Sequence, residues 1–219
     1  MSTRRTFLLQ LSRATGAVVL MPLVSRCGGA TAVEAAAAAA GPAIPRSLPA
    51  AWDPIAFNRI RGNAGAIPDS YLESINGPDG EAAHLGKHLP YLPEIDAESI
   101  PDGFVAIMWG DPEKGHAAHP NSARGEANNF EGHWYNSIKL RKATDDDAEE
   151  AESTYVDWPG IGEGSSGAYV VFGGGEITDD SGKQTVYLAA LPSDVEPGDT
   201  IRIYAHCLTH GEYVDFVQI

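Results

Sequence analysis

The second half of the chain is a succession of short apolar segments, and this succession most constrains the fold. Each segment is rich in Val, Ile, Tyr or Trp, and they occupy 103–110, 134–142, 167–173, 184–192, 199–207 and 212–219. Gly, Pro or Asp residues separate them, which is typical of strands joined by turns. The pattern predicts an all-β fold, an antiparallel β-sandwich.

Two other stretches are assigned by their composition. The acidic stretch 143–154, ATDDDAEEAEST, is predicted to be a solvated loop, because it lacks the spaced ligands and the glycine of a calcium loop. DSYLESI, residues 69–75, predicts a short helix that begins after Asp69 and ends at the turn residues NGPDG. It belongs to an N-terminal extension, residues 51–85, for which the sequence suggests no role.

The N-terminus reads as a targeting segment. Arg4 and Arg5 are followed by Phe7 and Leu8, and an apolar stretch runs to about Val24. This resembles a bacterial twin-arginine signal peptide, assigned to residues 1–30, and it predicts export to the periplasm. A generic Sec signal is the alternative. Residues 31–50, rich in Ala and Pro, are predicted to be a linker.

Cys27 has two alternative fates. It closes LVSRC, which resembles a lipoprotein cleavage box and makes Cys27 a candidate lipid anchor to the membrane, although Arg26 stands where a small residue is expected. Cleavage near Ala30 or Ala32 would instead remove it.

The charge of the chain excludes some partners. Residues 1–26 hold four of the fifteen Lys and Arg residues and none of the thirty Asp and Glu residues, so their removal changes the net charge from −15 to −19. Nucleic acid and anionic membrane surfaces are therefore not expected partners. Without Cys27, Cys207 has no second cysteine with which to form an internal disulfide, and it is either buried and inert or bound to something.

Cys207 lies in IYAHCLTHGEY, residues 203–213. Alternate side chains of a strand share a face, so Ile203, Ala205 and Cys207 are predicted to face the core and His206 to face away from it. His210 follows Cys207 at a spacing that lets a thiolate and an imidazole bind one metal ion. A buried free cysteine beside a surface histidine is the alternative.

Four elements in order carry a family resemblance. They are Lys87, His88 and Pro90; His119, Pro120 and Asn121; His133 with Ile138; and Cys207, His210 and Gly211 after a Pro-Gly-Asp-Thr strand start. Together, over residues 86–219, they resemble the superoxide reductase family, the iron-binding module of neelaredoxin and desulfoferrodoxin.

The resemblance implies an immunoglobulin-like sandwich that holds one mononuclear non-haem iron. Its ligands would be four imidazoles and one axial thiolate, from His88, His119, His133, His210 and Cys207. It implies reduction of superoxide to hydrogen peroxide, with electrons from an unidentified donor protein. It makes Lys87 the residue that guides superoxide and helps deliver a proton. Homo-oligomers occur in the family, so the resemblance also suggests a homo-oligomer.

The chain departs from the family pattern in three places. Gly86 stands where many members have a Glu that reaches the sixth position of the oxidised iron. The stretch between His119 and His133 is longer than usual, which leaves His116 as an alternative to His119, although His119 carries the Pro-Asn. No N-terminal Cys-x-x-Cys domain is present, so no second iron centre is implied.

Strand alternation also bears on where the metal would lie. His133 is an even number of positions from Tyr135, Ser137 and Lys139, so in a regular strand all four side chains would lie on one face, the more polar one. This predicts a metal at a rim near solvent and away from the core.

Two other functions compete with superoxide reduction. A cupredoxin-like copper electron-transfer protein also uses a cysteine and histidines on a β-sandwich, but it usually has an axial methionine soon after the second histidine, and residues 211–219 have none. The other is a redox-inactive exported β-sandwich that binds metal or a partner. A cysteine hydrolase is weakest, because no orienting acid or oxyanion hole is indicated.

Overall fold

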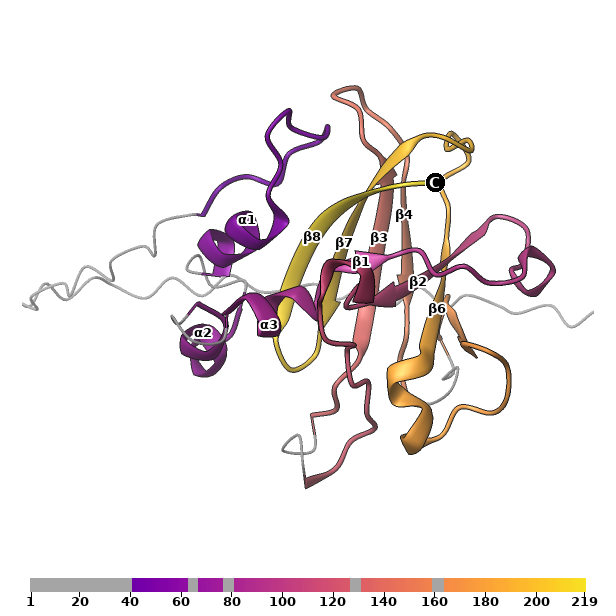
Figure 1. The fold of residues 1–219 in the computed structure, drawn as a ribbon. Helices are drawn as coiled ribbons and strands as arrows, with labels where there is room; N and C mark the ends of the chain where they lie inside the picture. The colour runs from indigo at the N-terminus through magenta and orange to yellow at the C-terminus, as the bar shows by residue number, and fades with distance from the viewer. Residues whose placement is uncertain (1–40, 63–66, 77–80, 127–130, 159–163) are drawn as a thin grey trace, which may run out of the picture. The chain divides into compact units, whose positions relative to one another are not determined.

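Two four-stranded antiparallel sheets make up the described part of the chain, which in this computed structural model comprises residues 41–62, 67–76, 81–126, 131–158 and 164–219. One sheet has the order β1-β2-β6-β5, with bounds Pro90–Tyr91, Phe104–Trp109, Thr185–Ala190 and Ala168–Val171. The other has the order β4-β3-β7-β8, with bounds Glu150–Thr154, Tyr135–Lys142, Thr200–Cys207 and Gly211–Gln218. The predicted all-β sandwich is confirmed at this level (Figure 1).

The main core lies where the inner faces of the two sheets meet. Ile107 and Tyr187 of the first sheet pack in one buried cluster with Ile138, Leu140 and Ile203 of the second. A smaller cluster of Ala106, Met108, Val186 and Leu188 is separate from it. The partly buried side chains of Ile95 and Ile100 pack against this smaller cluster. Strands β2 and β6 are therefore apolar at consecutive positions, which is expected of strands buried on both faces.

The acidic stretch 143–154 was predicted to be a loop, and for its last five residues this is wrong. Glu150–Thr154 forms edge strand β4, which pairs antiparallel with β3. Ser153 is 1% exposed and its hydroxyl accepts a hydrogen bond from the Ala190 N–H. Glu150 and Glu152 form ion pairs with Arg202 and Lys139. Basic residues on the neighbouring strands therefore offset the charges that had indicated a loop.

Strand β3 contains an irregularity that overturns the predicted placement of His133. Its pairing with β7 shifts between Tyr135 and Ser137, so Asn136 is an extra residue in the ladder. Such a bulge reverses the alternation on one side of it. Tyr135 is consequently fully buried with Ile138 and does not share the polar face of Ser137.

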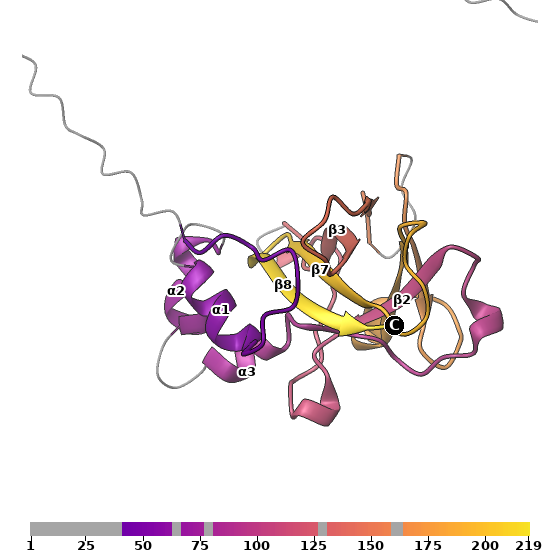
Figure 2. The same ribbon diagram turned by 90° about the horizontal axis from the view of Figure 1, so that it is seen from above.

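Three α-helices precede the first strand within the described residues: α1 Pro54–Arg61, α2 Asp69–Asn76 and α3 Glu81–Gly86. The predicted helix at 69–75 is thus confirmed as α2. Figures 1 and 2 show α1 to α3 on the side of the sandwich where β8 lies. After the first strand, the described residues also form 3-10 helices at Ala97–Ser99, Pro112–Lys114 and Asp179–Gln184.

Side chains of helix α1 and of Trp52, just before it, bind the outer edge of β8. The Asn58 amide donates to the Val214 carbonyl at 2.7 Å, and its oxygen accepts from the Val214 N–H at 2.9 Å. Arg61 pairs with Glu212 at 2.6 Å, and the Trp52 indole donates to Asp215 at 2.7 Å. The two Asn58 hydrogen bonds occupy backbone groups that an edge strand would otherwise leave unpaired.

The predicted signal peptide, Cys27 and the first half of the linker, residues 31–40, lie outside the described residues. Among the residues that are described, no helix is both long and apolar enough to cross a bilayer.

Candidate metal centre

Residues from four separate segments converge at one end of the sandwich. The ligand atoms of His88, His133, Cys207 and His210 all lie within 4.8 Å of one another, and all four residues are buried. The Nε2 of His119 lies 3.6 Å from the Cys207 sulfur, beside this group. Strand pairing explains the convergence, because β3 begins where β7 ends, at Tyr135 opposite Cys207. The start of β1 likewise lies opposite the end of β2, at Pro90 and Trp109.

His88 comes from the turn between α3 and β1. Its backbone N–H donates to the Leu85 carbonyl, and its ring Nδ1 lies 2.7 Å from the carbonyl oxygen of His84. We assign the ring proton to Nδ1, because a carbonyl can only accept, and this leaves the Nε2 lone pair facing the group. The Tyr213 ring stacks on the imidazole with 4.4 Å between centroids and 6° between planes.

His119 is oriented by Asn121. The Asn121 oxygen lies 3.0 Å from His119 Nδ1, while its amide nitrogen donates to the carbonyls of His119 and Gly182. Asn121 has a positive φ of 32°, a region that asparagine tolerates better than most residues. We assign the ring proton to Nδ1, because the Asn121 oxygen at 3.0 Å is nearer to it than the Asn121 backbone N–H at 3.3 Å, and this leaves the His119 Nε2 lone pair facing the sulfur. The structure therefore places His119, and the Pro-Asn that follows it, at the group.

His133 and His210 are held by short backbone elements. His133 forms an isolated antiparallel bridge with Ser122, which brings the segment after His119 beside it. His210 lies in the turn between β7 and β8, and Gly211 pairs with Cys207 at a φ of 85°. Because that φ is strongly disfavoured for other residues, a glycine suits this position and lets the turn close directly after His210.

The four imidazoles form a ring of neighbours. Centroid separations are 4.6 Å from His88 to His210, 4.6 Å from His210 to His133, 4.4 Å from His133 to His119 and 5.3 Å from His119 to His88. His88 and His133 lie opposite each other at 6.2 Å. The Cys207 sulfur lies near the other two opposite members, 3.6 Å from His119 Nε2 and 3.8 Å from His210 Nδ1.

The ring nitrogens that face one another favour a cation between them. His210 Nδ1 lies 3.1 Å from His88 Nε2 and 3.0 Å from His133 Nε2. One nitrogen proton cannot satisfy both neighbours, whereas a metal ion accepts all three lone pairs. Two nitrogen ligands about 2.1 Å from one ion and at right angles to each other would be about 3.0 Å apart. These side chains can therefore hold a metal ion, and the donor set is nitrogen and sulfur.

Burial keeps the imidazoles neutral. It lowers the pKa of His133 to about 4 and that of His210 to about 2, and it holds the pKa values of His88 and His119 well below the ordinary range. The charge of Lys87 acts in the same direction on all four. Neutral imidazole is the form that binds metals, so the rings need lose no proton at pH 7.

For Cys207, burial has the opposite consequence, because it disfavours the thiolate form that binds metals. Burial raises the pKa of Cys207 to about 12, and the backbone N–H groups of His210 and Thr209 together with Lys87 offset part of this rise. Both backbone donors lie in the turn between β7 and β8. The N–H of Leu208 instead donates to the Trp134 carbonyl at 3.0 Å. A bound cation would supply the stabilisation that a buried thiolate needs.

Lys87 is half-buried beside the group. Burial lowers the pKa of its ammonium, and the attraction of Cys207 opposes that effect. Its charge therefore acts directly on the centre, which agrees with the predicted placement of Lys87 at the site.

The Gly86 position is filled by another side chain. A Cβ on Gly86 would lie 2.4 Å from the His116 ring, so no larger residue fits unless that ring moves. His116 thus packs against α3, and the structure places His119, rather than His116, beside Cys207. Within the described residues, the group of ligand atoms contains no carboxylate.

His206, which directly precedes Cys207 in the sequence, does not belong to this group. His206 is on the opposite face of β7, where its Nδ1 is 2.6 Å from the Asn136 oxygen. Strand alternation predicted this, and β7 is regular over the residues concerned.

The predicted rim position of the centre is wrong. His88 and Cys207 are 0% exposed, and even His133 and His210 are only 9% exposed. The bulge in β3 is one reason, because it turns the His133 segment toward the core. The other is the N-terminal extension, whose Tyr71 ring meets the His210 ring edge-on at 4.5 Å.

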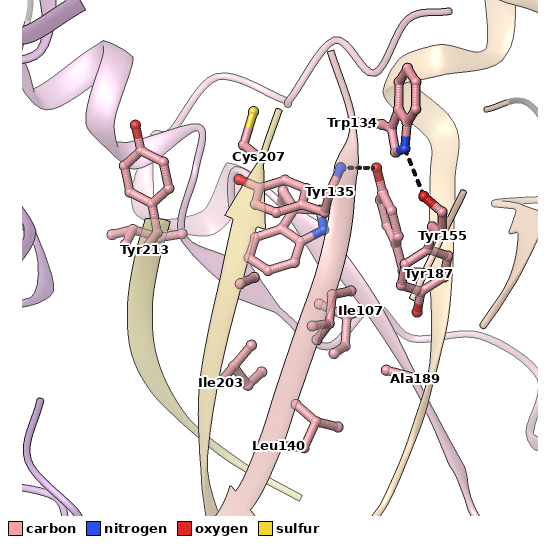
Figure 3. Packing of buried hydrophobic residues seen from close by; sticks show 14 of the residues in the cluster. Ile107, Trp134, Tyr135, Leu140, Tyr155, Tyr187, Ala189, Ile203, Cys207 and Tyr213 are labelled. Carbon is pink, nitrogen blue, oxygen red and sulfur yellow. Dashed lines mark hydrogen bonds between the residues drawn. The ribbon is translucent and has the colours of Figure 1, made fainter. Parts of the chain in front are cut away.

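Sequence reasoning missed the tyrosines that surround the centre. Tyr135 donates its hydroxyl proton to the His88 carbonyl at 3.2 Å, and Tyr213 donates to the His210 carbonyl at 3.1 Å. Tyr187 donates to the Asn121 oxygen that orients His119. Figure 3 shows Tyr135 and Tyr213 near Cys207 at the end of β7. The strand periodicity marks such residues only as core, so no sequence signal separated them from other packing residues.

No protein-family model, curated protein or solved structure matches this chain.

Proposed function

We propose that this protein is a superoxide reductase, which binds one mononuclear iron through His88, His119, His133, His210 and Cys207 and reduces superoxide to hydrogen peroxide. The observation that carries the proposal is the closed ring of four neutral imidazoles with one buried sulfur against it. Five donors of this kind would leave room for a small ligand at a bound ion. The immunoglobulin-like form of the sandwich belongs to the same proposal.

The chemistry divides between the ion and the chain. A ferrous ion held by these five residues would supply the electron that superoxide accepts. The Cys207 thiolate would donate electron density to the ion, as the thiolate ligand does in thiolate-ligated haem proteins. The backbone N–H groups of Thr209 and His210 donate hydrogen bonds to the sulfur, and these bonds reduce the electron density that the thiolate gives to the ion.

Lys87 is the residue proposed to attract the substrate and to relay a proton. The net charge of −19 after removal of residues 1–26 would repel an anion at long range. At physiological salt, however, the Debye length is about 8 Å, so distant carboxylates are largely screened. The local field at the site includes the ammonium of Lys87, whose pKa responds to Cys207. A lowered pKa also makes this ammonium a better proton donor.

The donor set argues against the copper alternative. A blue-copper site uses two histidines, a cysteine and a weak axial ligand, often methionine. Four imidazoles exceed that requirement. Met108 belongs to the smaller hydrophobic cluster, where its sulfur accepts a hydrogen bond from Tyr91, so among the described residues no methionine is placed to act as the axial ligand.

The proposal places the protein in the bacterial periplasm, delivered by the twin-arginine route, where an unidentified protein would supply electrons. It is tested by mixing the reduced, iron-loaded protein with superoxide in a stopped-flow or pulse-radiolysis experiment. We expect stoichiometric oxidation of the iron and one peroxide per iron. A protein that binds iron yet reacts no faster than free ferrous ion would instead be a redox-inactive metal-binding protein.

A further inference from the structure

The aromatic residues of the core are of one chemical kind. Every aromatic side chain classed as buried among the described residues is a tyrosine or a tryptophan, namely Trp109, Trp134, Trp158, Tyr135, Tyr155, Tyr169, Tyr187 and Tyr213. The phenylalanines in the same part of the chain, Phe57, Phe104, Phe172 and Phe216, are all more exposed. Phenylalanine would fill the core equally well and would bring no hydroxyl to satisfy.

Three of the buried hydroxyls have a structural explanation. Those of Tyr135 and Tyr213 bond to backbone carbonyls of His88 and His210, and that of Tyr187 bonds to Asn121. Each of these contacts fixes a candidate metal ligand or its partner. A fourth, Tyr155, donates to the Leu188 carbonyl at 3.0 Å, away from the centre.

The hydroxyl of Tyr169 has no such explanation. It is buried, and it has no hydrogen-bond partner in the described structure. A buried hydroxyl without a hydrogen-bond partner destabilises the folded state. Packing alone would therefore favour phenylalanine at this position, and the hydroxyl requires another reason.

The rings join the centre to the surface. From His119 to Tyr135 the centroids are 4.9 Å apart, from Tyr135 to Tyr187 5.8 Å, and from Tyr187 to Tyr169 5.0 Å. Trp109 stacks on Tyr135 at 3.6 Å. The series crosses from β3 to β6 between the sheets and then to edge strand β5, and Figure 3 shows Tyr135 and Tyr187 side by side where it crosses. Tyr169 lines a cavity of about 620 Å³.

We propose that Tyr135, Tyr187 and Tyr169 form an electron relay that protects the metal centre from its own product, peroxide. This inference rests on the proposed function, because it requires a redox-active metal at the site. When peroxide reacts at the reduced centre, the relay delivers an electron from Tyr169. Oxidation then ends on a residue at the cavity and spares the buried histidines and the sulfur.

The reaction balances with peroxide as the oxidant. One hydrogen peroxide accepts two electrons and two protons, its O–O bond breaks, and two waters form. One electron comes from the ferrous ion, which becomes ferric, and the other comes from Tyr169. Tyr169 also gives up its phenolic proton, which passes to solvent, and its side chain lines the cavity together with Glu94 and Asp96. The second proton comes from solvent, and Tyr135 and Tyr187 end unchanged.

The relay is not suited to ordinary turnover. A phenol is oxidised only by a much stronger oxidant than a thiolate-bound ferric ion. Electrons from a donor protein therefore need another route, whereas the peroxide reaction provides a sufficiently strong oxidant.

The experiment adds hydrogen peroxide to the reduced, iron-loaded protein with the spin trap 2-methyl-2-nitrosopropane. Electron paramagnetic resonance detects a tyrosyl radical, and peptide mass spectrometry locates the trap. We expect the adduct on Tyr169. In Tyr187→Phe the Tyr169 adduct, normalised to bound iron, should fall to background. In Tyr91→Phe it should be unchanged, because Tyr91 lies on β1 and bonds to Met108 outside the series.

Tyr169→Phe provides a second variant that removes only an unpaired hydroxyl. We expect unchanged or higher stability and faster bleaching of the iron chromophore by repeated peroxide. Bleaching at the wild-type rate, or a Tyr169 adduct that persists in Tyr187→Phe, would overturn the relay. Iron-loaded protein that consumes peroxide without labelling Tyr169 would overturn the relay alone. Failure to bind iron would overturn the proposed function as well.

Discussion

At the scale of residues, the β7–β8 hairpin places its two histidines in different surroundings. His210 faces the group and His206 faces Asn136 on the other side of the strand. The two differ by four positions in the sequence, and both belong to the same hairpin. They therefore make a matched pair for mutation.

His210→Ala should lower the iron content of the purified protein below one per chain, because it removes a ring nitrogen that two other imidazoles face. His206→Ala should leave the content unchanged. Elemental analysis of both variants, with circular dichroism as the check on folding, measures this. Equal iron content in the two variants would exclude His210 as a ligand.

Lys87→Ala should slow the bimolecular reaction with superoxide and weaken its dependence on ionic strength. The reason is that Lys87 supplies a positive charge at the reactive site of a molecule that is acidic overall. Stopped-flow rates at several salt concentrations measure both effects, and Lys183→Ala serves as an exposed control. An unchanged rate with an unchanged salt slope would remove Lys87 from the mechanism.

At the scale of elements, the sequence predicted regular strands well and irregular ones poorly. Ile203, Ala205 and Cys207 face the core of β7 as alternation requires. The same argument failed for Tyr135, because a single extra residue in β3 cannot be recognised from composition. Strand β4 was missed because its glutamates resemble loop residues until Arg202 and Lys139 are placed beside them.

The site itself was more accessible to sequence reasoning than its surroundings. Cys207 and His210 stand out by spacing, and His119 by the Pro-Asn that follows it. The distances among His88, His119 and His133 could not be derived, since they depend on the antiparallel pairing of distant strands. The role of Asn58 at the β8 edge was likewise invisible, because it is a contact across 156 positions.

The N-terminal extension should stabilise the sandwich through that contact. Asn58→Ala removes two hydrogen bonds to the backbone of Val214, each worth about 1 kcal/mol, so the free energy of unfolding should fall by about 2 kcal/mol. Urea denaturation measures the change. Gln218→Ala, at the exposed end of β8, is the control and should change it by less than about 0.5 kcal/mol. Equal effects of the two variants would contradict the role given to Asn58.

At the scale of the whole molecule, the buried imidazoles make stability depend on pH. In the metal-free protein the pKa of His133 is about 4 and that of His210 about 2, whereas unfolded histidine has a pKa of about 6.5. Between these values the unfolded chain binds protons that the folded chain does not. The stability is therefore fully present above pH 6.5 and is lost as the pH falls.

We expect the free energy of unfolding of the metal-free protein to fall between pH 6.5 and 4. The limiting slope is about 1.4 kcal/mol per pH unit for each imidazole that stays neutral in the folded state. Urea titrations at a series of pH values measure it, and His133→Gln should reduce the slope. A stability that is flat over this range would contradict neutral, buried imidazoles.

The central claim is that Cys207 and four histidines bind one iron, and the absorption spectrum of the oxidised, iron-loaded protein tests it most directly. A thiolate-to-Fe(III) band in the visible should be present in the wild type and absent from Cys207→Ser, which should remain folded. Retention of the band in Cys207→Ser, or an intense blue Cu(II) band in place of it, would contradict the account.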